Sequence, residues 1–300
     1  MVTVSGTGWT YVFDTATGTL TSMNAAGSEL LRGGPRLDVY RPPTSNETSA
    51  WGTEDRKLWR DVGLDRLRTS VTSVTADPAA DGAAVVEVRS QVAAADAADA
   101  LTFDQTMRYR IDRQGTITLS HHVQARGSKV STLPYLPRVG FSVQVPDSMQ
   151  RFAWYGRGKE ESYNDRKDGT PVGVWTSTVD EEYVPYSRPQ AYGNHTDTRW
   201  ATVSDGQRAG VLVAGDLDVS VTPYDDLARA EYDFQLPFVR NRGWVTLHVE
   251  HGETGMGETP NSVLVPNRLP ANRAYDYQVT LRPLTAAEAG GVGVPDSRRR

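Results

Sequence analysis

The segment LTFDQTMRYRIDRQGTITLSHHV, residues 101–123, decides the fold class of this chain. Apolar and polar side chains alternate along both halves of the segment, which is typical of β-strands with one buried face. The turn-forming run DRQG at residues 112–115 separates the halves, so the segment is predicted to form a β-hairpin. The apolar face is expected to consist of Leu101, Phe103, Met107, Tyr109 and Ile111 on the first strand, and of Ile117, Leu119, His121 and Val123 on the second.

The same alternation recurs on both sides of the hairpin. Few segments have helical periodicity: a short helix is expected at residues 225–231, and the Ala/Asp-rich residues 92–100 are expected to form a loop. Many long strands without crossover helices predict an all-β antiparallel sandwich. We expect one domain, residues 1–284, and a flexible tail, residues 285–300. The remaining alternating positions are Tyr11 and Phe13; Val139, Phe141, Val143 and Val145; Val211 and Val213; Val245, Leu247 and Val249; and Tyr275, Tyr277, Val279 and Leu281.

Composition excludes several classes of function. The 300-residue chain has a net charge of −5, which gives no reason to expect a nucleic-acid partner, and it has no cysteine for disulfides, thiolate metal sites or a thiol nucleophile. No apolar run approaches the roughly 20 residues of a membrane helix, so no membrane partner is expected. The start MVTVS does not resemble a signal peptide, which predicts a cytoplasmic protein. The strand pattern begins at Val2, as expected of a separate subunit or a domain cut from a longer protein. No cofactor and no metal are expected.

Residues 154–200 interrupt the alternation with aromatic, Arg, Asn and Gly residues. Such a mixture suits sugars, because ring faces pack against the C–H side of a pyranose while polar groups bind its hydroxyls. A purely structural loop has the same composition. Arg157, Asp165 and Arg166 are expected to form a salt-bridge network that shapes this loop. The segment contains WYGRG at 154–158, YNDRK at 163–167, PY at 185–186, PQ at 189–190, GNH at 193–195 and RW at 199–200.

This segment resembles the C-terminal, small-chain domain of family-two β-galactosidases. The resemblance continues on both sides of it, over residues 13–283. The element RPPTSNE at 41–47 resembles the R-A-P-x-D-N-D element of the family, and Trp59 with Gly63 and Leu64 resembles the W-x-x-x-GL that follows. GMG at 255–257 resembles the G-x-G loop, and residues 275–283 resemble the last strand of the domain.

The resemblance implies a galactose-mutarotase-like antiparallel supersandwich. It also implies a partner, a (β/α)8 barrel that carries the catalytic glutamates, because some bacteria encode the two parts as separate large and small chains. We therefore expect the C-terminal domain or small subunit of a β-galactosidase-like glycoside hydrolase that shapes a galactoside site. No catalytic residue is assigned to this chain, and the isolated chain is expected to be inactive.

The resemblance also supplies candidate substrate-binding residues. Trp51 lies on the loop of residues 48–57 (TSAWGTEDRK), where it is expected to stack on the leaving sugar, or to pack on its own domain. Asn46 and Glu47 occupy the positions of the family's Asn and Asp, and they are expected either to bind sugar hydroxyls or to fix the loop. Asn261 and Ser262 lie on the loop after G-x-G, where the sugar-stacking Trp of the family falls near Ser262.

The strand of residues 245–253 leaves three interpretations open. In the first, its second face is a surface or interface without chemistry. In the second, the chain is an independent enzyme that resembles aldose epimerases, which use a Glu base and a His acid; Glu250 would be the base, and His195 rather than His121, which lies on an apolar strand face, would be the acid. In the third, His248, His251 and Glu253 bind a metal, although His-x-x-His aligns on a helix rather than on a strand.

A different class of function is a stand-alone sugar-binding module. In such a module Trp51, Trp59 and Trp154 would supply the aromatic platforms.

Overall fold

The structure is a computed structural model that describes residues 1–48, 54–224, 227–241, 243–258 and 263–291. Its strands form a four-stranded sheet, β1 to β4, and a twelve-stranded sheet, β5 to β16, and every pairing between neighbouring strands is antiparallel. The predicted all-β antiparallel sandwich is therefore confirmed. The strands are β1 Val2–Gly6, β2 Trp9–Asp14, β3 Thr19–Ala25, β4 Ser28–Glu29, β5 Gly33–Asp38, β6 Arg68–Pro78, β7 Ala84–Ala93, β8 Thr102–Ile111, β9 Ile117–Arg126, β10 Arg138–Pro146, β11 Arg151–Arg157, β12 Val172–Thr178, β13 His195–Ser204, β14 Gly210–Thr222, β15 Trp244–Glu253 and β16 Ala274–Pro283.

The predicted hairpin is β8 and β9. Tyr109 lies opposite Leu119, and the amide of Asp112 donates to the carbonyl of Thr116 at 3.0 Å to close the turn. Gly115 has a φ of +83°, a conformation that glycine adopts without steric cost. The apolar residues of both strands are buried, as the alternation predicted.

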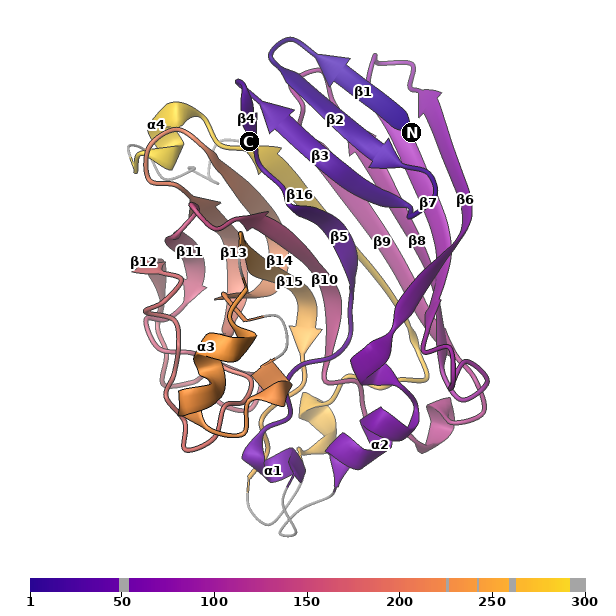
Figure 1. The fold of residues 1–300 in the computed structure, drawn as a ribbon, viewed down its shortest axis with the longest axis vertical. Helices are drawn as coiled ribbons and strands as arrows, with labels where there is room; N and C mark the ends of the chain where they lie inside the picture. Colours follow the sequence, from indigo (N-terminus) through magenta and orange to yellow (C-terminus); the bar gives the residue numbers. More distant parts are fainter. Residues whose placement is uncertain (49–53, 225–226, 242, 259–262, 292–300) are drawn as a thin grey trace.

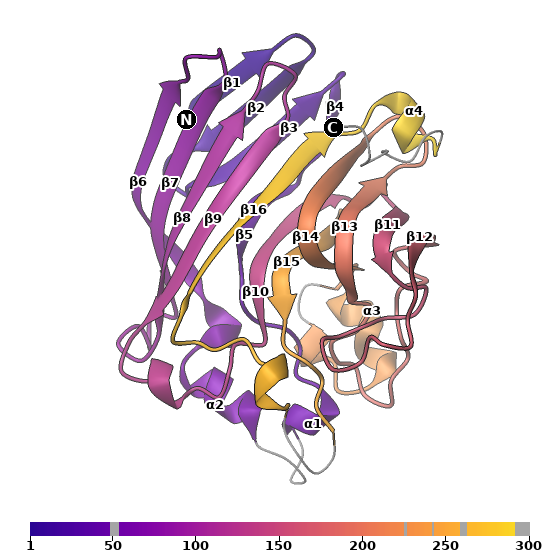
Figure 2. The same ribbon diagram turned by 180° about the vertical axis from the view of Figure 1, so that it is seen from behind.

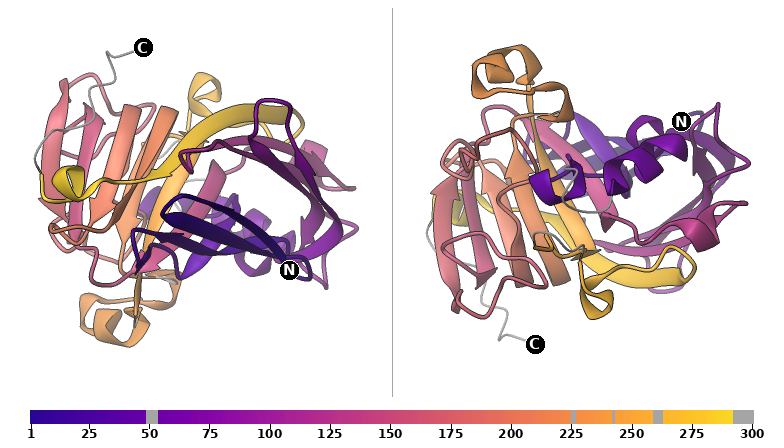
Figure 3. Two further views of the ribbon diagram at one scale, coloured as in Figure 1. Left: turned by 90° about the horizontal axis from the view of Figure 1, so that it is seen from above. Right: turned by 90° about the horizontal axis from the view of Figure 1, so that it is seen from below.

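The large sheet curls and branches, so that its strands lie on two sides of one core (Figures 1 and 2). The main path runs β12-β11-β13-β14-β16-β9-β8-β7-β6, and β15, β10 and β5 branch from it at β14. Seen along the strands, β5 and β10 face β9 and β16 across the interior (Figure 3). Side chains from both sides fill the space between them, including Phe13, Tyr109, Phe141, Trp154 and Leu281.

Helices are short and lie at the ends of the strands. α1 and α2 lie together at the end of the molecule opposite β4 and α4 (Figure 1). Within the described ranges, no helix is long and apolar enough to cross a bilayer. Of the helix expected at residues 225–231, the described part contains a 3₁₀ turn at Leu227–Arg229. The loop expected at residues 92–100 is confirmed for residues 94–100, whereas residues 92–93 end β7. The helices are α1 Ser45–Thr48, α2 Asp55–Asp61, α3 Leu236–Val239 and α4 Ala286–Ala289, and the 3₁₀ turns are η1 Leu64–Arg66, η2 Val130–Thr132, η3 Leu227–Arg229, η4 Asp233–Gln235 and η5 Val265–Asn267.

Residues 285–291 fall within the segment that we expected to be a flexible tail, but they are ordered on the sheet. Thr285 and Glu288 form a reciprocal capping box at the start of α4. Glu288 also pairs with Arg282 of β16 at 2.7 Å, and Ala289 is buried against Leu212. These contacts dock the helix against β14 and β16.

Candidate functional site

A single buried arginine connects the two chain segments that meet beside α1. The guanidinium of Arg41 binds Glu47 through two contacts, Nη2 to Oε1 at 2.8 Å and Nη1 to Oε2 at 3.3 Å. Its Nε lies 3.1 Å from Oε1 of Glu253, and its Nη2 donates to the carbonyls of Thr254 and Gly255 at 3.3 Å. Planar, bidentate pairing of this kind fixes orientation as well as distance. Arg41 therefore ties the start of α1 to the end of β15.

Two further side chains hold residues 255–257 from opposite sides. The amide Nδ2 of Asn46 donates to the carbonyls of Met256 and Gly257 at 3.1 and 3.2 Å. The carboxylate of Asp165 accepts the amides of the same two residues at 2.9 and 2.8 Å. This clamp explains both glycines of the GMG motif: a Cβ on Gly255 would lie 2.3 Å from Oδ2 of Asp165, and Gly257 has a φ of +68°.

The polar segment 154–200 supplies other anchors for the same region. Asn164 donates to the carbonyl of Glu253 at 2.8 Å. Oε1 of Gln190 accepts both the amide and the hydroxyl of Ser45, at 2.9 and 3.1 Å. The segment 154–200, whose composition suits sugar binding, therefore holds the start of α1 and the end of β15 in place.

These anchors surround a cavity of about 520 Å³, which we call the junction cavity. Its volume lies in the range of about 300–1,000 Å³ that is usual for small-molecule sites. It offers an amide, a carboxylate, a guanidinium, a phenol and apolar side chains, which is a suitable set for a polyhydroxylated ligand. The lining includes Asn46, Asp165, Arg166, Tyr186, Met256 and Leu264.

The predicted substrate-binding residues have different outcomes. Trp51, Asn261 and Ser262 lie outside the described residues. Asn46 lines the junction cavity, where it also fixes the loop. Glu47 is only 2% exposed and is bound to Arg41, so its expected contact with a sugar is wrong and its role is to fix the loop.

The tryptophans proposed for a binding module are core residues, so that prediction is wrong for both described members. Trp59 is fully buried and its ring meets Tyr135 edge-on at 5.8 Å between centroids. Trp154 is fully buried and stacks on His195 at 3.9 Å. Neither ring can present a face to a sugar.

The expected salt-bridge network is also wrong in its connections. Arg157 pairs with Asp197 at 2.5 Å, whereas Arg166 pairs with Glu161. Asp165 binds backbone amides instead of either arginine. The three residues therefore stabilise different parts of the loop.

The structure does not bring Glu250 and His195 together. The His195 ring packs on Trp154 in the main core, and its Nε2 lies 2.7 Å from Oε2 of Glu182. Val249 belongs to the same core, so Glu250, the next residue of β15, points to the opposite face. The predicted acid and base are thus separated by the sheet, and an epimerase-like pair of these two residues is wrong.

The opposite face of β15 is neither a surface nor an interface strand, since ionisable side chains are buried there. We call Asp38, Arg41, Glu47, Arg138, Glu250 and Glu253 the buried charge cluster; none is more than 7% exposed. Arg138 Nε lies 2.9 Å from Oδ1 of Asp38 and 3.6 Å from Oε1 of Glu250. Burial raises the pKa of Glu253 to about 7 and that of Glu250 well above its usual range. Burial opposes ionisation of Asp38 too, but Arg138 and His248 hold its pKa below the usual value.

The metal triad expected from His248, His251 and Glu253 does not form. His248 binds Asp38 at 2.5 Å, His251 stacks on Tyr277 at 5.1 Å, and Glu253 pairs with Arg41. The three side chains have separate partners.

Sequence reasoning missed the clamp and the charge cluster. Asp165 belongs to the YNDRK motif, but nothing in the sequence indicated that its carboxylate would bind backbone amides about 90 residues away. Arg41 and Gln190 belonged to matched elements whose partners only the fold reveals. Asp38 had no motif around it at all.

A family model described as "Beta galactosidase small chain" matches residues 5–281, which is nearly the whole chain. The chain belongs to the β-galactosidase small-chain family. Among curated proteins, the small-chain sequence is 31% identical over 291 residues to a "Beta-galactosidase" of Priestia megaterium and 28% identical over 291 residues to "Beta-galactosidase BgaC" of Bifidobacterium adolescentis. These matches cover 94% and 93% of this chain but 26% of each relative, so the small chain spans about a quarter of their length.

Among solved structures, a galactose 1-epimerase from Lactobacillus acidophilus NCFM covers 95% of the small chain with a TM-score of 0.48 and 10% identity. A GalM/aldose epimerase homologue from C. elegans gives a TM-score of 0.47 and 9% identity. Both likenesses are distant.

Proposed function

We propose that this chain is the C-terminal domain or small subunit of a β-galactosidase and that it forms one wall of the enzyme's sugar site. The observation that carries the proposal is the clamp of Asn46 and Asp165 on residues 256–257. It joins α1 and the loop of Asp165 to residues 256–257. The loops that follow α1 and GMG in the sequence are the two elements that the family resemblance assigns to the sugar site. Trp51, Asn261 and Ser262 belong to the same two loops, so we propose them as sugar contacts together with Asn46.

The second part of the proposal is that the catalytic carboxylates reside in another part of the enzyme. Retaining glycosidases need two carboxyl groups about 5–5.5 Å apart around a cleft that holds the sugar. The close carboxyl pair Asp38 and Glu250 is buried, and the neighbouring cavity measures about 50 Å³. Since a liquid water occupies about 30 Å³, this space fits water and not a sugar ring. The pair is therefore unsuited to glycoside hydrolysis, and we propose that the isolated chain is inactive.

Exposed apolar residues support a partner surface. Phe234 and Phe238 lie in the segment that connects β14 to β15, and their side chains are 72% and 84% exposed. Val265, next to Leu264 of the junction cavity, is 73% exposed. Large exposed apolar side chains in groups are typical of interaction sites. We propose that the barrel-bearing part of the enzyme covers them, since the matched relatives are about four times as long as the aligned segment.

The test is hydrolysis of a chromogenic β-galactoside by the purified chain, alone and mixed with a barrel-bearing large chain. We expect activity only in the mixture, and weaker activity when the chain carries Asp165→Asn. The matched control is Asp168→Asn, which removes an exposed carboxylate from the same loop. Hydrolysis by the chain alone would overturn the proposal.

A further inference from the structure

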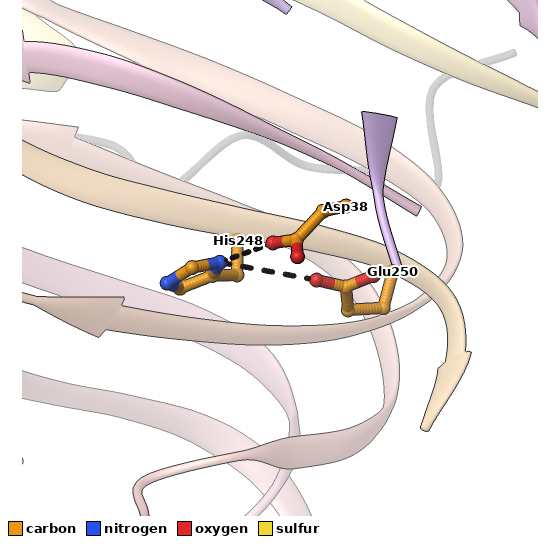
Figure 4. A group of neighbouring side chains, drawn as sticks. All are labelled: Asp38, His248 and Glu250. Atoms are coloured by element: carbon orange, nitrogen blue, oxygen red, sulfur yellow. Dashed lines mark hydrogen bonds and ion pairs between the residues drawn. The ribbon is translucent and has the colours of Figure 1, made fainter. Parts of the chain in front are cut away.

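We infer that Asp38, His248 and Glu250 form a binding site for one divalent transition-metal ion, of which Zn²⁺ is the best-suited example. The site lies on the face of β15 away from the main core, and it is distinct from the junction cavity. The inference does not depend on the proposed role in a β-galactosidase. Figure 4 shows the three side chains converging.

The three side chains converge because of the strand order. Asp38 of β5 and Glu250 of β15 both lie opposite Gly140 of the central strand β10, and His248 lies opposite Ser142. A Cβ on Gly140 would fall 2.1 Å from Oε2 of Glu250, so only glycine leaves room for the carboxylates to meet. The ladder is irregular between Val139 and Gly140, and such bulges redirect side chains.

The donor atoms lie near the spacing that a small cation requires. His248 Nδ1 lies 2.5 Å from Oδ2 of Asp38 and 4.0 Å from Oε1 of Glu250, and one donor atom of each residue lies within 4.8 Å of the other two. Bonds of roughly 2.0–2.2 Å to zinc place neighbouring ligand atoms about 3.4 Å apart in a tetrahedral site. The 4.0 Å separation is longer than this spacing and the 2.5 Å separation is shorter, so binding would require Glu250 to move closer and His248 and Asp38 to move apart.

Glu250 supplies an independent reason to place a cation here. It is fully buried, and no donor group of the described residues hydrogen-bonds to its carboxyl oxygens, which meet the carboxyl group of Asp38 instead. The nearest guanidinium, that of Arg138, is 3.6 Å away and is already engaged by Asp38 and by the carbonyl of Tyr40. Two carboxyl groups that meet in a buried site must share either a proton or a cation, because two adjacent buried negative charges repel each other.

The charge balance of the buried charge cluster points the same way. Its members are four carboxylates and two guanidinium groups, all nearly excluded from water. With all six groups ionised, the carboxylates outnumber the guanidinium groups by two; in the absence of an ion, burial favours the protonated forms of Glu250 and Glu253 instead. One divalent cation would neutralise the two excess negative charges.

The donor set selects the class of ion. One imidazole nitrogen with two carboxylate oxygens suits Zn²⁺, and Mn²⁺ next, better than Mg²⁺ or Ca²⁺, which prefer oxygen ligands alone. A cavity of about 50 Å³ borders His248, Arg138 and Ser220, and it leaves room for a water as the fourth ligand. His248 is 14% exposed, which provides a route for the ion.

The ion would have a structural consequence. β5 runs directly into the Arg41 segment and α1, while β15 runs directly into residues 254–258. An ion between Asp38 and Glu250 would cross-link the two strands that carry the clamped loops.

The experiment uses the full chain, stripped with a chelator and checked by elemental analysis, and then titrated with ZnCl₂ by calorimetry. We expect one Zn²⁺ per chain and a rise in Tm of several degrees at saturating zinc. His248→Ala and Glu250→Gln should abolish binding, and Asp38→Asn supplies the same test if Glu250→Gln does not fold. His122→Ala, which removes an exposed histidine, is the matched control and should bind as the parent does.

Two outcomes would overturn the inference. One is the absence of zinc binding to the folded, stripped chain, which would mean that Asp38 and Glu250 share a proton instead of an ion. The other is binding that survives Glu250→Gln and Asp38→Asn, or that is lost in His122→Ala, because the ion would then sit elsewhere. Neither result bears on β-galactoside hydrolysis, so this inference and the proposed function can fail separately.

Discussion

Replacing Asp165 with asparagine tests how firmly the clamp holds residues 256–257. The carboxylate accepts two backbone amides, those of Met256 and Gly257, at 2.9 and 2.8 Å. Asparagine keeps one acceptor oxygen but turns an N–H group toward the second amide, and it removes the negative charge. Hydrogen bonds to charged groups contribute about 1.5–3 kcal/mol each. Asp165 is exposed, so water screens it and the lower value applies.

The change should therefore cost roughly 2 kcal/mol of local opening free energy, which counts one bond lost at the lower value and one weakened bond. Since about 1.4 kcal/mol corresponds to a tenfold change, the amides of Met256 and Gly257 should exchange roughly 30-fold faster. The free energy of global unfolding should change much less, because the clamp lies at the end of the strands and the loop opens locally.

The assay is hydrogen exchange followed by mass spectrometry or NMR on the full chain, with Asp168→Asn as the control. If residues 256–257 exchange at the parent rate in Asp165→Asn, the clamp does not hold the loop. If Asp168→Asn accelerates their exchange equally, the effect is one of general surface charge, and the reasoning also fails.

Three further predictions concern the core and the charge cluster. His121 is buried between Tyr277 and Gln105, and burial lowers its pKa to about 3. In the unfolded chain His121 is protonated at a higher pH than in the folded chain, so about 2 kcal/mol of stability should be lost as the pH falls from 6.5 to 5. Chemical denaturation at both pH values measures this loss, which should be absent in His121→Gln. Gly140→Ala places a Cβ 2.1 Å from Glu250 Oε2 and 2.4 Å from the carbonyl of Val249, so urea unfolding should report a destabilisation of at least about 2 kcal/mol, and a parent-like midpoint would contradict the account of this site. Trp59→Ala should cost about 3–5 kcal/mol in the same measurement because it empties a buried site, without a change in sugar binding by the chain.

The sequence predicted the fold class because alternation reports which face of a strand is buried. The β8 and β9 hairpin and the core positions of β10 and β16 followed from that pattern alone. Helix α2 was missed because its first three residues, 55–57, lay in the loop that the resemblance assigned to residues 48–57, and no helix was predicted for residues 58–61. Residues 285–291 were missed because their order depends on tertiary contacts, above all the pair of Arg282 and Glu288.

The candidate site was less predictable than the fold. The motifs indicated the correct region, yet the partners of Asp165, Arg41 and Glu250 lie on strands far away in sequence. Alternation cannot tell whether the second face of a strand meets water or other charges, so a surface or interface, an acid/base site and a metal site all stayed open for β15. His121 was correctly placed on the buried face, because the apolar neighbours on its strand fixed that face; its partners Tyr277 and Gln105 came only from the fold.

The clamp also constrains the order in which the newly made chain can finish folding. Asn46 and its acceptor Met256 are 210 residues apart, and Arg41 and Gly255 are 214 apart. At roughly 5–20 residues per second, a ribosome needs about 10–40 s to produce the second partner after the first. During that interval Arg41 and Glu47 have emerged without Glu253 or residues 254–257, and the contacts around α1 must be among the last to form. The region proposed to meet the sugar is thus completed only when almost the entire chain has left the ribosome.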